Sequence, residues 1–70
     1  MRKKAVVSPQ RERLIKARED LKLNRQELAV MAGIDRTTLT HIESGRGTSV
    51  DIALAIAKSL NRSVEYLFLP

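Results

Sequence analysis

Residues 25–44, RQELAVMAGIDRTTLTHIES, decide the fold of this 70-residue chain. Their apolar spacing predicts two short helices, over residues 25–32 and 36–44, which are joined by a tight turn. A helix-turn-helix needs a small residue where the helices cross, a glycine in the turn and aliphatic residues that lock both helices to a core. Seven residues meet these demands at the required spacing: Leu28, Ala29, Ala32, Gly33, Ile34, Leu39 and Ile42. A helical hairpin with the same packing and no ligand is the alternative interpretation.

Residues at the helix ends support these bounds. Asn24 and Glu27 form an N-x-x-E capping arrangement before the first helix of the pair. Gly33 is expected to end that helix in the left-handed conformation that glycine tolerates. Asp35 is expected to cap the second helix.

The sequence before this pair predicts a first helix and a basic arm. Ser8 can cap a helix and Pro9 suits its first position, so we expect a helix over residues 9–22. Its buried stripe is predicted to contain Leu14, Ala17 and Leu21, and its outer face carries Arg11, Arg13, Lys16 and Lys22. Residues 1–8 are expected to form a flexible basic arm and residues 9–70 the folded domain.

The sequence after the pair predicts two more helices. Thr48 with Asp51 forms a capping box that opens a helix over residues 49–60. This helix is apolar almost all round, which predicts that it is the central buried helix. Asn61 is its expected C-cap, and a short fifth helix covers residues 64–68. With no strand signal, the predicted fold is an all-α, compact five-helix bundle.

The net charge of +5 is unevenly distributed along the chain. Residues 1–26 contain nine Lys and Arg against three Asp and Glu, whereas residues 27–70 contain four against five. Such asymmetry favours a polyanionic partner, either nucleic acid or an acidic membrane surface. A charge of this size also serves solubility alone.

Other function classes find little support in the sequence. The absence of cysteine removes disulfides and thiolate metal sites, and it fits a cytoplasmic protein. No apolar run approaches the roughly 20 residues of a membrane span. The single histidine, His41, has Thr37 and Gly45 one turn away, so no second metal ligand accompanies it. We therefore expect no enzyme activity, no cofactor or metal, no small-molecule ligand and no membrane contact.

The segments LNRQELAVMAGI, LTHIESGR, IALAIAKSL and SVEYLF follow the order found in one family of regulators. Over residues 10–68 the chain resembles the phage repressor/Cro-type helix-turn-helix family, the xenobiotic-response-element-like bacterial and phage regulators. The resemblance implies a lambda-repressor-like fold and sequence-specific binding of double-stranded DNA by a transcriptional regulator. One departure is the loop GRGTS, which is shorter than the common form and lacks its usual proline.

The resemblance also implies roles for individual residues. The second helix of the pair enters the major groove with its N-terminal half facing the base edges. The candidates for base contact are Arg36, Thr37, Thr38, Thr40 and His41. The candidates for phosphate contact are Arg25, Gln26, Arg46 and Gly47. Family members often pair Arg18 and Glu43 in a salt bridge between the first and third helices, which would keep Arg18 from the DNA. The basic arm lies outside the region of resemblance. Its residues Arg2, Lys3 and Lys4 either follow the DNA backbone or enter the minor groove, or they have no role.

One reading helix covers only a few base pairs, so we expect a homodimer on a palindromic operator, acting as a repressor. The candidates for the dimer interface are Val64, Tyr66, Phe68 and Leu69, whereas Leu67 is expected in the core. The alternative function is an antitoxin or protein-binding adaptor that uses the same domain to bind a partner protein. A steep loss of binding with salt would distinguish DNA binding from an apolar protein contact.

Overall fold

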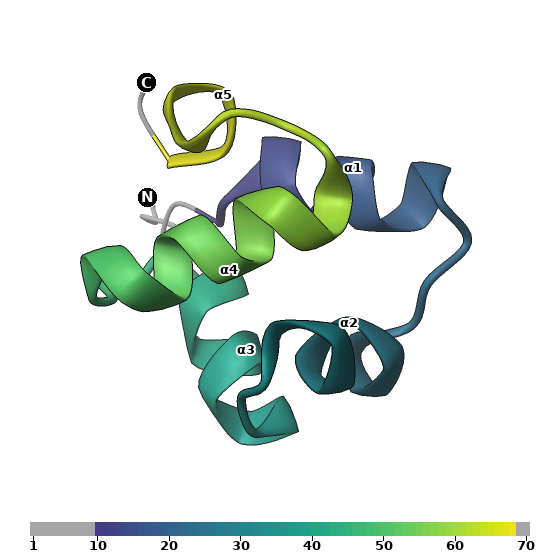
Figure 1. The fold of residues 1–70 in the computed structure, drawn as a ribbon, viewed down its shortest axis with the longest axis horizontal. Coiled ribbons are helices and arrows are strands. Elements are labelled where there is room, and N and C mark those ends of the chain that lie inside the picture. Colours follow the sequence, from purple (N-terminus) through teal and green to yellow (C-terminus); the bar gives the residue numbers. More distant parts are fainter. Residues whose placement is uncertain (1–9, 69–70) are drawn as a thin grey trace, which may run out of the picture.

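A computed structural model of the chain describes residues 10–68, and this part is folded into five helices (Figure 1). The helices are α1 (Glu12–Asp20), α2 (Arg25–Ala32), α3 (Arg36–Glu43), α4 (Val50–Leu60) and α5 (Val64–Phe68). The all-α class and the predicted helix order are confirmed. None of these helices has the length and apolar character that crossing a membrane requires.

α4 lies across the middle of the bundle, with α2 and α3 toward one end and α5 toward the other (Figure 1). It packs against α2 and α5, while α1 packs against α5 and α3, and α2 packs against α3. The core between them is aliphatic. Its largest fully buried apolar side chains come from four different helices: Leu14, Leu28, Leu39, Ile42, Ile56 and Leu60. Leu67 of α5 is also buried, as predicted.

The start of α1 differs from the prediction. The helix begins at Glu12 instead of residue 9, and Arg11 occupies the N-cap position without a side-chain cap. The backbone N–H of Arg11 donates to the Glu43 carbonyl at 2.9 Å, which holds this residue in a non-helical conformation. The expected cap Ser8 and the expected first residue Pro9 lie outside the described residues. α1 also ends earlier, at Asp20, so Leu21 is half exposed and not part of the buried stripe.

Four helices end in the same hydrogen-bonded arrangement. A residue with a left-handed backbone follows each of α1 to α4: Lys22 (φ 60°), Gly33 (φ 74°), Gly45 (φ 106°) and Asn61 (φ 57°). In each case the next residue donates its N–H to a carbonyl five positions earlier, as Ile34 does to Ala29 at 2.9 Å. These bonds form the Schellman motif, which satisfies the last carbonyls of a helix. The expected ends at Gly33 and Asn61 are confirmed, and Lys22 was not foreseen.

The helix starts agree with the predictions in part. The capping box of Asn24 and Glu27 is confirmed, with both hydrogen bonds at 2.8 Å. Asp35 has the extended backbone of an N-cap residue, but its side chain makes no capping bond. The cap of α4 is Ser49, whose Oγ accepts the Ile52 N–H at 3.2 Å. The predicted box starting at Thr48 is therefore wrong by one residue.

α4 is central, but it is not buried on every side. Ala53, Ile56, Ala57 and Leu60 are buried, and they come from the sides that contact other helices. Val50 and Leu54 remain 73% and 52% exposed. The prediction of a helix buried all round is thus wrong on this side, because no other helix among residues 10–68 covers it.

Candidate nucleic-acid interface

α2, the turn at residues 33–35 and α3 form the predicted helix-turn-helix (Figure 1). Gly33 turns the chain, and Ile34 is partly buried against the core. Three residues of α3 face inward and are buried: Leu39, Ile42 and Glu43. They recur at positions that lie on one side of a helix, and among residues 10–68 the opposite side of α3 remains exposed at Arg36, Thr37 and His41.

The outward side of α3 carries the candidates for base contact. Arg36, Thr37 and His41 are exposed, whereas Thr38 and Thr40 are partly buried. The Thr40 hydroxyl donates to the Arg36 carbonyl at 3.0 Å. Because a hydroxyl has one hydrogen, Thr40 in this rotamer can accept a hydrogen bond from a base but not donate one. The structure therefore places three candidates on open surface and two at its margin.

The candidates for phosphate contact lie near the C-terminal end of α3. Arg25 is the first residue of α2, and its Nε donates to Oε1 of Glu43 at 2.8 Å. Gln26 beside it is exposed. Arg46 and Gly47 are exposed in the loop after α3, and the Arg46 N–H donates to the His41 carbonyl at 3.1 Å. The two groups of candidates thus adjoin the helix that carries the base candidates.

Arg18 and Glu43, assigned to one salt bridge, lie in contact inside the protein. Arg18 Nε donates to Glu43 Oε2 at 2.8 Å, and both side chains are at least nine-tenths buried. Arg18 also donates through Nη1 to the Leu23 carbonyl at 2.8 Å, in the linker between α1 and α2. One buried arginine therefore holds α1, this linker and α3 together, and it is not available to DNA.

The sequence did not reveal the role of Arg11, which was expected on the outer face of the first helix. Its Nη1 donates to the Ile42 carbonyl at 2.8 Å and to the Arg46 carbonyl. Its guanidinium also lies 5.0 Å from the centre of the Phe68 ring. Arg11 thus supports the loop that presents Arg46. No motif signals this role, because the three partners are distant in sequence.

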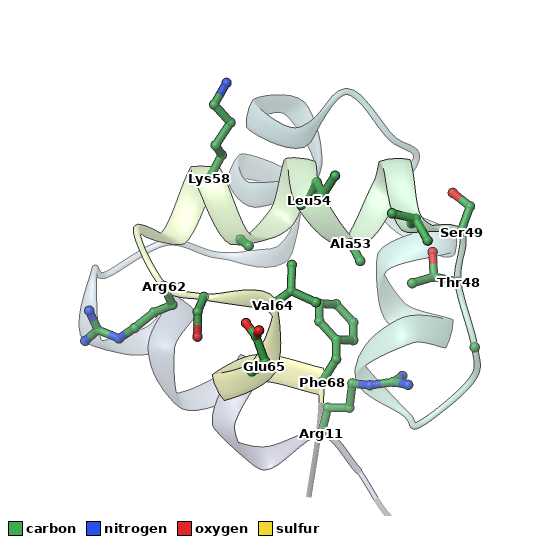
Figure 2. Close-up of a pocket in the computed structure, with 14 residues that line it drawn as sticks. Arg11, Thr48, Ser49, Ala53, Leu54, Lys58, Arg62, Val64, Glu65 and Phe68 are labelled. Carbon is green, nitrogen blue, oxygen red and sulfur yellow. The ribbon is translucent and has the colours of Figure 1, made fainter.

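The candidates for a dimer interface do not all share one surface. Val64 and Phe68 of α5 line an apolar groove against α4, where Ala53 points back toward them (Figure 2). The exposed α4 residues Val50 and Leu54 extend the same groove. Tyr66 lies elsewhere, with its ring 5.4 Å from the Arg13 guanidinium and 5.9 Å from that of Arg62. Leu69 is outside the described residues.

Comparison with known proteins places the chain in a helix-turn-helix family. A model of the helix-turn-helix family matches residues 14–67, which is well over half of the chain. The match begins in α1 and ends in α5, so it includes α2, the turn and α3. A comparison with curated proteins gave no match.

Proposed function

Because the chain belongs to the phage repressor/Cro-type helix-turn-helix family of DNA-binding transcriptional regulators, we propose that it is a repressor that binds a palindromic operator as a homodimer. In this proposal α3 lies in the major groove of double-stranded DNA, and α2 lies across the backbone. The single observation that carries the proposal is the division of α3 into a buried side and an exposed polar side.

The exposed side of α3 has the chemistry for reading base edges. The Arg36 guanidinium can donate two parallel hydrogen bonds to O6 and N7 of guanine. Thr37 offers a methyl group to thymine and a hydroxyl to a base or phosphate. His41 has two ring nitrogens that can donate or accept. The partly buried Thr38 and Thr40 contribute at the edge of this surface.

The phosphate contacts fix α3 in the groove in this proposal. Arg25 and Gln26 contact the backbone on one side of the groove, and Arg46 and Gly47 contact it through the loop after α3. Such contacts provide most of the affinity without reading sequence. Binding should therefore weaken steeply as the salt concentration rises.

Two copies are needed because one α3 reads too few base pairs for useful specificity. A twofold axis would place the two reading helices about 34 Å apart, one turn of the double helix. The groove between α4 and α5 is the surface best suited to this pairing, since it exposes Val50 and Leu54 beside Val64 and Phe68. We expect the free protein to dimerise weakly and the operator to complete the pairing.

Selection of bound duplexes from a random DNA pool tests the proposal. The expected result is a palindromic motif with two half-sites, bound by two protein chains. Arg36→Ala should weaken binding of the selected duplex by about 1–3 kcal/mol and relax the preference at one position of each half-site. Lys16→Ala removes an equal charge from the exposed side of α1, outside the groove between α4 and α5, and should leave the selected motif unchanged.

Two results would count against this function. An Arg36→Ala protein that selects the wild-type motif with wild-type affinity would show that this face does not read bases. Full affinity of a single chain for a single half-site would show that no dimer is required.

A further inference from the structure

Glu43 binds two arginines through one buried carboxylate. Its Oε2 accepts from Arg18 Nε and its Oε1 from Arg25 Nε, each at 2.8 Å. The side chain of Glu43 is 1% exposed and that of Arg18 is 10% exposed, but that of Arg25 is 42% exposed. The carboxylate thus joins a buried guanidinium to one that reaches the surface.

Within residues 10–68, the Arg25 side chain is held through its Nε alone. Arginine has five N–H donors, of which the Nε–H is one. Within residues 10–68, the Nη groups of Arg25 have no hydrogen-bond acceptor. They remain available to an outside acceptor, and their parallel N–H groups fit two oxygens of a phosphate.

Arg25 and Glu43 each lie at the end of a helix that disfavours their charge. A helix favours negative charge at its N-terminus and positive charge at its C-terminus. Arg25 is the first residue of α2 and Glu43 is the last residue of α3, so both are placed the unfavourable way. The N-terminus of α2 is already capped by Asn24 and Glu27. The pair therefore serves the contact between the helices and the position of Arg25, and not the stability of either helix.

We infer that Glu43 is a positioning residue for DNA binding, which holds Arg25 through Nε so that its Nη groups contact a backbone phosphate. This inference rests on the proposed function. Ordering Arg25 before binding removes much of the entropy cost of fixing a long side chain in the complex. Because Glu43 belongs to α3, the phosphate contact is also fixed relative to the base-reading residues.

Arginine-to-lysine substitutions test whether an arginine that is fixed by a protein partner contributes more to DNA binding than one that is not. Binding is measured on a mixed-sequence DNA duplex at low salt, since a phosphate contact does not depend on sequence. Arg25→Lys keeps the charge, but an ammonium cannot reproduce the arginine geometry toward Glu43 and a phosphate together. We expect Arg25→Lys to weaken binding about tenfold. Arg46→Lys is the matched control, because the Arg46 side chain has no protein partner within residues 10–68, and it should weaken binding less than about threefold. Equal losses would overturn the inference.

For Glu43→Gln, two explanations predict opposite changes in the affinity for DNA. Removal of a negative charge near DNA should tighten binding if only the overall charge matters. If Glu43 positions Arg25, binding should weaken instead, and the slope of log affinity against log salt should fall by up to about 1. Thermal unfolding establishes whether Glu43→Gln is folded. Tighter binding by the folded variant would contradict the inference, and if the variant is unfolded, the two lysine variants decide.

The same measurements distinguish failure of the inference from failure of the proposed function. If the wild-type protein does not bind the duplex at low salt, the proposed function itself fails. If the wild type binds and Arg25→Lys behaves like Arg46→Lys, only the role assigned to Glu43 fails. A purely structural role for Arg25 would lower the unfolding temperature of Arg25→Lys and leave the salt slope unchanged.

Discussion

Arg11 connects three parts of the chain that are far apart in sequence. Its side chain donates to carbonyls of α3 and of the loop after it, and its guanidinium lies over the ring of Phe68 in α5. Its backbone N–H donates to the last residue of α3. A residue that precedes the first helix thus fixes the C-terminal end of α3.

Truncation of this side chain should destabilise the fold. Arg11→Ala removes two hydrogen bonds, each worth about 1 kcal/mol, and a cation–π contact worth about 0.5–1 kcal/mol. We expect the free energy of unfolding to fall by about 2 kcal/mol, as measured by urea denaturation. Lys16→Ala is the control and should change it by less than about 0.5 kcal/mol, because within residues 10–68 Lys16 makes only an exposed ion pair with Asp20. Arg11→Ala with wild-type stability would refute this account.

Contacts between individual side chains were the hardest feature to predict from the sequence. The exposed positions of Arg36, Thr37 and His41 follow from helical periodicity, since the same pattern that buries Leu39 and Ile42 turns them outward. The bond between Arg25 and Glu43 does not follow, because it depends on the angle between α2 and α3. Periodicity fixes which side of a helix a residue occupies, but not which residue it meets on another helix.

At the scale of the element, the helix ends show how one motif accepts different residues. The left-handed position is Lys22 after α1, Gly33 after α2, Gly45 after α3 and Asn61 after α4. Glycine has no Cβ, and asparagine tolerates this conformation better than most residues. Lysine does not, so the end of α1 carries a backbone strain that the other three ends lack.

Exchanges at two of these positions should change stability in opposite directions. Lys22→Gly removes the strain but makes the unfolded chain more flexible, so we expect a net gain of about 0.5 kcal/mol. Gly33→Ala should cost about 1 kcal/mol. A Cβ at Gly33 would meet no atom within 4 Å, so this cost comes from the backbone alone. Urea unfolding of both variants measures the two changes, and changes of equal sign would show that backbone strain is not the cause.

Most element bounds could be predicted because capping residues are local signals. The bounds of α2 and α5 match the predicted ranges, and α3 and α4 differ by one residue at one end. Thr48 and Ser49 are adjacent hydroxyl residues, so the sequence alone could not decide which one caps α4. The predicted start of α1 was wrong because a tertiary hydrogen bond from Arg11 to Glu43 overrides the local capping signal of Ser8 and Pro9.

At the scale of the whole molecule, the groove between α4 and α5 was the least predictable surface (Figure 2). Val50 and Leu54 belong to an apolar run that indicates burial, but nothing within residues 10–68 covers them. Apolar side chains grouped at an open groove are typical of protein contacts. Periodicity cannot distinguish burial within one chain from burial between two chains.

A charge placed in this groove should weaken the proposed homodimer. Leu54→Glu introduces a carboxylate that would lose its water on pairing, so we expect sedimentation to show monomers at concentrations where the wild type dimerises. Val30→Glu is the control, because Val30 is 67% exposed on α2, outside the groove, and should leave the association unchanged. Unfolding measurements on both proteins confirm that each chain is folded. Wild-type association of Leu54→Glu would exclude this groove as the interface.

The division of α3 into a buried and an exposed side has a consequence for engineering. Leu39, Ile42 and Glu43 anchor the helix, so a randomised library at positions 36, 37 and 41 would vary the surface proposed to read DNA while leaving the scaffold intact. Surface substitutions of this kind usually change stability by less than about 0.5 kcal/mol. Most members of such a library should therefore fold, and selection could act on their choice of DNA alone. The five-helix bundle would then serve as a small scaffold for variants that bind new operator sequences.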